Sequence, residues 1–283
     1  MHSLSDPNIS IITPAPHPNP ATDTGWSFPD TQPGILAAIA AGANTIWANT
    51  PLFSDHPLIT TSLPPWIKLI ANPPKVVDVV DDKAFTNKLF QPHCFPTPKS
   101  WLLEGDPKRS IERLGQLVYD LPYAVIVKPV RGRGSEGVQL VNGFVGMLDV
   151  LDDLLNIYNV GLVEELLEGE EGTVTLVPDG QGNFMALPIV QIFDQVSGVM
   201  PWSGHVPVTK NSRVLSVRKE DSWHRAAKIE RQKAAELLKL TSVTRIDIRR
   251  KYENGGKFFL FDVNPKPVPP SPAHANFLSS SIV

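Results

Sequence analysis

The sequence predicts a mixed α/β and α+β fold in which a small β-α-β unit precedes two α+β units. Near the N-terminus, two short apolar runs flank a helix-like segment that ends just before Gly42. In the middle of the chain, short β-like runs separated by glycines enclose a helical pattern. Towards the C-terminus, a long amphipathic helix precedes two strand-like runs joined by a turn sequence. We place the three units at residues 1–82, 83–177 and 178–283.

The elements of the first unit are short and separated by prolines. Residues 9–12 predict a buried strand, and residues 45–47 predict a second strand. Residues 33–41 between them predict a helix, because proline suits a first helical turn and glycine suits the position just past the end. The apolar segments 66–70 and 76–80 lie between prolines, and the sequence leaves their types open.

The elements of the two later units follow hydrophobic period and turn residues. After Asp81 and Asp82, a helix begins at Lys83 and stops at Pro92. Further helices are predicted at 111–118, 148–155 and 220–240, and strands at 123–129, 137–141, 161–167, 173–177, 245–250 and 258–263. The last two strands are joined by residues 253–256, Glu-Asn-Gly-Gly, a strong hairpin signal.

Composition excludes several classes of protein. Hydrophobic residues make up 42% and charged residues 19%, an ordinary globular balance. A formal net charge of −3 argues against nucleic-acid binding, which needs a basic surface. Cys94 is the only cysteine, so an internal disulfide is excluded and a reducing compartment is favoured. The longest apolar run, residues 35–41, is too short to span a bilayer. We expect a soluble, cytoplasmic protein.

A G-x-G-x-x-G pattern runs from Gly132 to Gly137, directly after the predicted strand that carries Lys128. In a dinucleotide-binding unit such a loop opens a helix, whereas residues 138–141 predict a strand. In protein kinases the essential lysine follows the loop, whereas Lys128 precedes it. The segment is either a hairpin whose backbone N–H groups close over phosphates, or a glycine-rich surface hairpin.

The C-terminal hairpin carries a second cluster of polar residues. Strand alternation places Arg245 and Asp247 on one face. On the returning strand Asp262 and Asn264 share a face, with Phe261 on the opposite one. Pairing through the turn sets Asp247 beside Asp262 and Asn264.

This cluster has the chemistry of a magnesium site. Two carboxylates and an amide oxygen are the hard oxygen ligands that Mg²⁺ prefers. The neighbouring Arg245 is placed to offset negative charge on a transferring phosphoryl group. The alternative is a solvated polar face on an edge hairpin.

Taken in order, these motifs resemble the ATP-grasp superfamily, and within it the D-alanine–D-alanine ligase type, from about residue 81 to 267. Four segments carry the resemblance: Asp82-Lys83 with Pro96-Thr97-Pro98, Lys128 with Arg131 and the glycine loop, the acidic run at 163–174, and the hairpin residues Arg245-Ile246-Asp247 and Asp262-Val263-Asn264-Pro265. The resemblance implies an ATP-grasp fold, in which two α+β subdomains clasp ATP.

The resemblance also implies a role for each matching residue. Contacts with the ATP phosphates would come from Lys83, Lys128, Gly132, Gly134 and Ser135. Contacts with adenine and ribose would come from Glu164, Glu165, Leu167 and Glu171; the alternative for this run is an acidic solvated turn. Mg²⁺, with Mn²⁺ as a substitute, would be held by Asp247, Asp262 and Asn264. Arg245 and Lys128 would be catalytic.

The implied reaction joins a small-molecule carboxylate to an amine through an acyl phosphate, with ADP as a product; a homodimer is compatible with it. Several segments depart from the family pattern. Asp262 replaces a glutamate, residues 265–270 replace a Ser-Pro-Gly-like stretch, and His205 lies where a lid lysine is usual. The N-terminal unit lacks the family's glycine-rich substrate turn. An ATP-binding pseudoenzyme or scaffold, and an ATP-grasp small-molecule kinase, are therefore alternatives.

Overall fold

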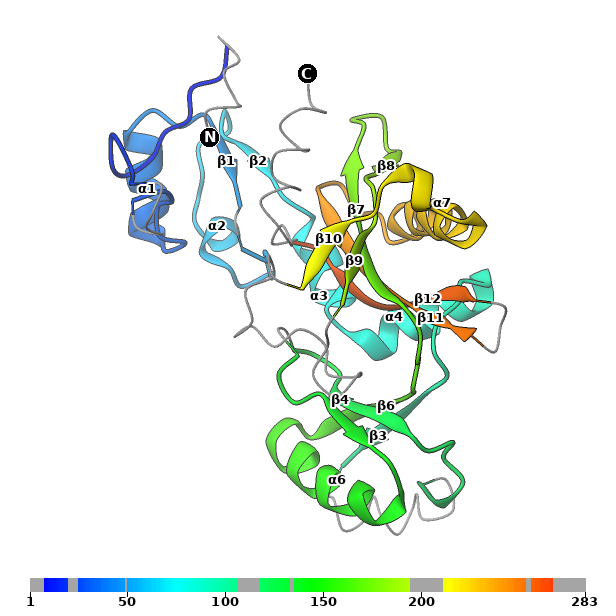
Figure 1. Ribbon diagram of the computed structural model, residues 1–283. Coiled ribbons are helices and arrows are strands. Elements are labelled where there is room, and N and C mark those ends of the chain that lie inside the picture. The colour runs from blue at the N-terminus through cyan, green and yellow to red at the C-terminus, as the bar shows by residue number, and fades with distance from the viewer. Residues whose placement is uncertain are drawn as a thin grey trace.

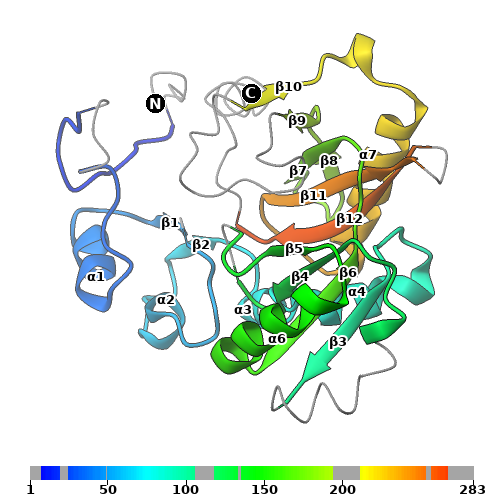
Figure 2. The same ribbon diagram turned by 60° about the horizontal axis from the view of Figure 1, so that its bottom comes forward.

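The structure is a computed structural model of the 283-residue chain (Figure 1). Within the described ranges, the chain forms three units, and the N-terminal unit lies to one side of the other two (Figure 2). Each unit surrounds its own cluster of buried apolar side chains. No helix in these ranges is long and apolar enough to cross a membrane. The ranges are 8–19, 25–48, 50–105, 118–132, 135–193, 211–252 and 256–266.

The N-terminal unit contains two short helices and a two-stranded parallel sheet. The side chain of Thr31 accepts a hydrogen bond from the N–H of Gly34 and caps the first helix. Buried Ile35, Leu52 and Leu58 form its small core. The elements are α1 (Gln32–Ala40), β1 (Thr45–Trp47), α2 (Pro57–Thr60) and β2 (Lys68–Ile70). The predicted helix and the strand at 45–47 are confirmed.

The predicted strand at residues 9–12 is wrong. These residues have no regular secondary structure, and β1 pairs with β2 instead. The run is short and ends at Thr13-Pro14, and a proline has no N–H to donate to a strand ladder. Of the two segments left open, 68–70 forms β2 and 76–80 lies in helix α3 (Pro74–Val80).

The second unit is a four-stranded antiparallel sheet with the order β3-β6-β4-β5. Helix α6 packs against it through buried Met147, Leu151 and Leu154 (Figure 1). The glycine loop joins β4 to its antiparallel neighbour β5, as predicted. The elements are β3 (Ser100–Glu104), β4 (Val125–Pro129), β5 (Gln139–Val141), α6 (Phe144–Tyr158) and β6 (Val160–Glu165).

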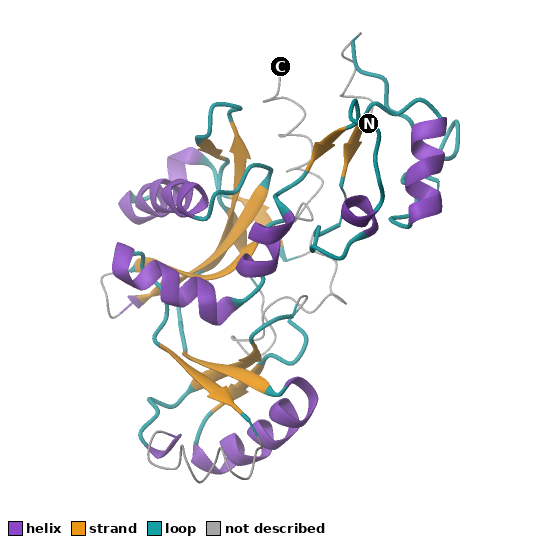
Figure 3. Cartoon of the chain, turned by 180° about the vertical axis from the view of Figure 1, so that it is seen from behind, coloured by secondary structure: helices purple, strands orange, loops and turns teal. Residues whose placement is uncertain are grey.

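The third unit is a six-stranded sheet with the order β10-β9-β7-β11-β12, in which β8 also pairs with β7. Helix α7 packs on one face of this sheet (Figure 3). Val174, Ile246 and Leu260 are buried on that face. The antiparallel pair β11–β12 confirms the predicted hairpin strands, whereas turn residues 253–255 lie outside the described ranges. The elements are β7 (Glu171–Pro178), β8 (Phe184–Ala186), β9 (Val190–Ile192), β10 (Ser212–Val214), α7 (Ser222–Leu237), β11 (Thr244–Lys251) and β12 (Lys257–Asn264), with 3₁₀ turns at Gln91–His93 and Val217–Lys219.

The sheets divide the chain differently from the predicted boundary at 177/178. Strand β7 lies in the third unit, because it pairs with β11 on one side and with β9 and β8 on the other. Helix α4 (Lys83–Phe90) begins at the predicted residue, where the side chain of Asp82 accepts a hydrogen bond from the N–H of Phe85. Its last residue, Phe90, is fully buried in the core of the third unit. The end of helix α4 therefore packs into the third unit, whereas the predicted boundaries place this helix in the second.

Candidate functional site

Lys128 and Glu164 form a buried ion pair where the two larger sheets meet. Lys128 lies on β4 and Glu164 on β6, with Nζ and Oε2 2.7 Å apart. The two residues are 4% and 3% exposed. Lys128 also donates a hydrogen bond of 3.2 Å to the backbone carbonyl of Phe261 on β12. This lysine therefore links the four-stranded sheet to the six-stranded sheet.

The carbonyl of Phe261 is available because β12 is irregular at this point. Asp247 pairs with Asp262, but Ile248 pairs with Leu260, so Phe261 is an extra residue in the ladder. Its ring lies on the side of Lys128, with Nζ 5.7 Å from the ring centroid. The expectation that Phe261 faces away from the site is wrong, because a bulge interrupts strict alternation.

Asn87, which the sequence did not single out, completes this cluster. It lies on α4, is 2% exposed, and donates a hydrogen bond of 3.0 Å from Nδ2 to Oε1 of Glu164. Both oxygens of Glu164 therefore have a partner, one from Asn87 and one from Lys128. Asn87 lies four residues after Lys83, so both side chains lie on the same face of α4. This spacing could have identified Asn87 from the sequence.

Arg245, Asp247 and Asn264 form a tight group on β11 and β12. Arg245 donates two hydrogen bonds to the carboxylate of Asp247, at 2.9 and 3.1 Å. Asn264 donates a third from Nδ2, at 3.0 Å. Burial disfavours the charged form of Arg245, but the charges of Asp247, Asp262 and Glu171 outweigh that effect and raise its pKa above the usual value. The predicted proximity of Asp247 to Asp262 and Asn264 is confirmed.

Lys83 connects the glycine loop to this acidic group. Its ammonium donates a hydrogen bond of 3.0 Å to the carbonyl of Gly132 and lies 3.6 Å from Oδ1 of Asp262. Ser135 has a positive φ of 63°, and its carbonyl accepts the N–H of Val138. Gly134 lies outside the described residues, as do the residues around His205 and those from 267 onwards.

The donors for a magnesium ion have the right chemistry but already have protein partners. Asp247 and Asp262 supply carboxylate oxygens, and Mg²⁺ in nucleotide sites is typically held by one or two carboxylates together with phosphate oxygens. Among the described residues, no group of three or more His, Cys, Asp or Glu side chains could hold a metal ion. The paired carboxylates of Asp247 and Asp262 match the share of ligands that a protein supplies in such a nucleotide site.

The acidic run after β6 is held in place by residues of both sheets. Glu165 accepts a hydrogen bond from the N–H of Lys99 at Oε1, and its Oε2 lies 2.6 Å from Nζ of Lys251. Its own N–H donates to the carbonyl of Lys99. Leu167 is buried, and Glu171 lies 3.4 Å from Arg249. The predicted adenine and ribose residues thus lie at the end of β6, in the linker between the sheets and at the start of β7.

Gly169 lies against β11 in this linker, and we expect its replacement with alanine to destabilise the protein. A Cβ at this position would lie 2.5 Å from Cβ and 2.8 Å from the carbonyl oxygen of Arg250. Relief of such overlap typically costs about 1–3 kcal/mol. Urea unfolding of Gly169→Ala should show this loss. Gly146→Ala, whose Cβ would meet only Val141 at 3.9 Å, is the control and should not lose stability. Equal stability of both variants would contradict the tight approach.

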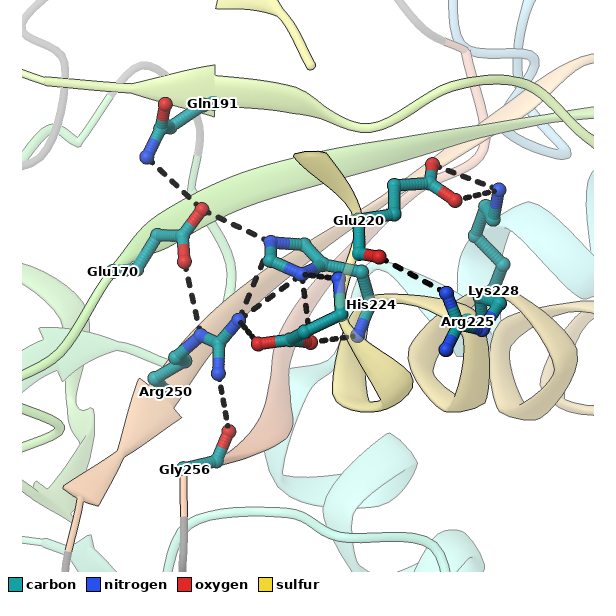
Figure 4. A network of polar contacts seen from close by, with 9 residues as sticks. Glu170, Gln191, Glu220, His224, Arg225, Lys228, Arg250 and Gly256 are labelled. Carbon is teal, nitrogen blue, oxygen red and sulfur yellow. Dashed lines mark hydrogen bonds and ion pairs between the residues drawn. The ribbon is translucent and has the colours of Figure 1, made fainter. Parts of the chain in front are cut away.

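A polar network next to the linker connects it to α7 and β11 (Figure 4). Arg250 donates hydrogen bonds to Glu170 at 2.9 Å, to Asp221 at 2.7 Å and to the carbonyl of Gly256 at 3.1 Å. The ring of His224 lies between Glu170, at 3.2 Å, and Asp221, at 2.8 Å. Neither this network nor its central arginine was expected from the sequence.

The network lowers the pKa of both its carboxylates. Burial alone would raise the pKa of Glu170, but the hydrogen bond with His224 and the charges of His224 and Arg250 outweigh burial. Burial also opposes ionisation of Asp221. There the hydrogen bonds from the backbone of His224 and from the side chains of Arg250 and His224 hold the pKa well below its usual range. Both carboxylates are therefore charged across the neutral range, one directly before β7 and the other at the N-cap of α7.

Comparison with known proteins gives a family whose model matches more than half of the chain. The family described as "D-ala D-ala ligase C-terminus" matches residues 97–269. The D-alanine–D-alanine ligase of Chromohalobacter salexigens is 28% identical over 211 residues, which cover 71% of this chain and 62% of that protein. The corresponding ligase of Aquifex aeolicus is 28% identical over 188 residues, covering 66% of this chain and 58% of that protein. The chain thus spans about three fifths of the length of these two relatives.

Solved structures show the same fold at low identity. The D-alanine–D-alanine ligase of Bacillus anthracis complexed with ATP superposes with a TM-score of 0.56 at 19% identity, over 75% of this chain and 64% of that one. The biotin carboxylase–β-γ-ATP complex from Campylobacter jejuni gives a TM-score of 0.65 at 14% identity, over 84% of this chain and 52% of that one. These likenesses support the predicted ATP-grasp fold for the two larger units.

Proposed function

The chain belongs to the D-ala D-ala ligase C-terminus family, and from this premise we propose that it binds Mg²⁺–ATP between its two larger sheets and joins a small-molecule carboxylate to an amine. One observation carries the proposal. Two lysines, an arginine and two aspartates from segments far apart in the sequence meet at the interface of the sheets: Lys83, Lys128, Arg245, Asp247 and Asp262. Such a set suits a polyphosphate and a divalent cation.

The proposed reaction has two steps that balance without a nucleophilic side chain. An oxygen of the substrate carboxylate attacks the γ-phosphorus of ATP, the bond to the β-phosphate oxygen breaks, and ADP leaves. The amine nitrogen then attacks the acyl carbon, inorganic phosphate leaves with the bonding electrons, and the proton lost by the nitrogen passes to the departing phosphate or to solvent. Catalysis of this kind depends on positioning and on neutralising phosphate charge.

In this proposal each charged side chain interacts with the phosphates of ATP or with Mg²⁺. Lys83 and Lys128 contact phosphate oxygens, and Arg245 faces the transferring phosphoryl group. Asp247, Asp262 and Asn264 would hold Mg²⁺, which supplies further neutralisation of the phosphates when it is bound. Arg245 stays protonated at any working pH, because its pKa is raised above an already high value.

The linker would bind the adenosine part of the nucleotide. Glu164 and the backbone of Glu165 and Leu167 would contact adenine, and Glu171 would accept hydrogen bonds from the ribose hydroxyls. Since the N–H of Glu165 is already bonded to the carbonyl of Lys99, this N–H is not the group of Glu165 that would contact the base. Glycine-loop residues Gly132, Gly134 and Ser135 would cover the phosphates.

A product assay tests the proposal. The protein is incubated with Mg²⁺–ATP and a panel of amino acids and hydroxy acids, singly and in pairs, and ADP, phosphate and coupled products are measured. The proposal predicts ADP and phosphate only when a carboxylate and an amine are both present. A stable phosphorylated product from a single acceptor would instead indicate a small-molecule kinase. ATP binding without turnover under any pairing would indicate a pseudoenzyme.

A further inference from the structure

Two threonine hydroxyls on β7 are buried beside the proposed site and have no partner. Thr173 and Thr175 are 1% and 3% exposed, and neither Oγ1 atom has a hydrogen-bond partner. The large majority of buried hydroxyls in proteins have a hydrogen-bond partner, so a buried hydroxyl without one needs a physical explanation. A threonine that needed only to fill space could be a valine of the same shape.

The register of the sheet places both threonines directly opposite charged residues of the proposed site. Thr173 lies directly opposite Asp247, and Thr175 lies opposite Arg245. The alternate residue Val174 and its partner Ile246 are in the core under α7, so the threonines face the other way. They therefore share a face of the sheet with Asp247 and Arg245.

The same face also carries Glu171, two residues before Thr173. Side chains on one face of a strand follow each other at about 7 Å. A nucleotide with its ribose on Glu171 and its γ-phosphate near Arg245 would lay its phosphate chain along Thr173 and Thr175. Resting on the proposed function, we propose that these two hydroxyls donate hydrogen bonds to phosphate oxygens of bound ATP.

The test uses Thr173→Val and Thr175→Val, with affinities for ATP and adenosine measured by calorimetry and displacement, and with Tm recorded for each apo protein. Each valine should weaken ATP binding by about three- to tenfold, the effect of one lost hydrogen bond. Affinity for adenosine should be unchanged. The Tm should be unchanged or higher, because an unpartnered buried hydroxyl is removed. Thr173→Ser retains the hydroxyl and should bind ATP like the wild type.

Thr244→Val is the matched control on the same sheet. Thr244 is 0% exposed, but its hydroxyl donates to the carbonyl of Ser242 and it pairs with core residue Leu176. This variant should have a lower Tm than the wild type and the same affinity for ATP. Unchanged ATP affinity in both Thr173→Val and Thr175→Val, or an equal loss for adenosine, would overturn the assignment. A Tm loss in them without a change in affinity would show that water or the protein itself satisfies the hydroxyls.

A third variant, Lys128→Met, distinguishes a failure of this assignment from a failure of the proposed function. If Lys128→Met weakens ATP binding and the two valine variants do not, only the assignment of the hydroxyls fails. If none of the three changes ATP binding, the nucleotide site itself is wrong.

Discussion

Replacing Lys128 with methionine is expected to weaken ATP binding by about 10- to 100-fold and to destabilise the protein by about 3–5 kcal/mol. The first effect follows from loss of a charged donor to phosphate, which contributes about 1.5–3 kcal/mol. The second follows because Glu164, 3% exposed, would keep its buried charge without the ammonium at 2.7 Å. Calorimetry with ATP and urea unfolding of the apo protein measure the two effects.

A double variant separates binding from stability. In Lys128→Met with Glu164→Gln, both buried charges are removed, so most of the lost stability should return while ATP affinity stays low. Asn87 can still donate to the new amide oxygen of residue 164, which preserves that contact. Full recovery of ATP affinity in the double variant would mean that Lys128 acts only as the counter-ion of Glu164.

Lys228 provides the matched control. It forms an ion pair of the same length, 2.7 Å, with the buried carboxylate of Glu220 beside α7. Lys228→Met should therefore lower stability as well, but it should leave ATP affinity unchanged. If Lys128→Met and Lys228→Met weakened ATP binding equally, the effect would be one of general stability, and Lys128 would have no place in the nucleotide site.

The parts of the site that could be predicted from the sequence are those governed by local periodicity. Alternation along β11 placed Arg245 and Asp247 on one face, and Ile246 and Ile248 are indeed in the opposite core. The glycine loop was identified as a strand connection because residues 138–141 have β character, and β4 and β5 pair as that requires. Helix α4 begins at Lys83 as predicted, and Asp82 is its N-cap.

The parts that could not be predicted depend on contacts between distant segments. The extra residue at Phe261 arises from register between β11 and β12, which no spacing within β12 reveals. The bond from Asn87 to Glu164 joins residues 77 positions apart. Strand β7 looks like a continuation of the preceding strands in sequence, yet its partners β9 and β11 all come later in the chain. Local pattern gives the faces of a strand, but not its neighbours.

Arg250 gives the second large expected effect, because one buried guanidinium there supports three segments. Replacing it with methionine should destabilise the protein by about 3–5 kcal/mol, since the partly buried Glu170 would lose its hydrogen bond at 2.9 Å. The cation also lies 4.4 Å from the ring centroid of Phe258, a contact that methionine would reproduce only in part. Arg213→Met is the control, since Arg213 is exposed and bonds to the neutral side chain of Gln191; it should cost less than about 1 kcal/mol.

The effect of Arg250→Met should also depend on pH in one direction. The pKa values of Glu170 and Asp221 are lowered in the folded protein, so their ionisation stabilises it above the ordinary carboxyl pKa of about 4. That contribution is lost as pH falls from about 4 through the lowered values. Because Arg250 is one cause of both shifts, the stability difference between wild type and Arg250→Met should be largest near neutral pH and should shrink below about pH 4. Urea unfolding from pH 7 down to pH 3 measures it, and a difference that is constant over this range would mean that Arg250 acts through packing against Phe258 and not through the two carboxylates.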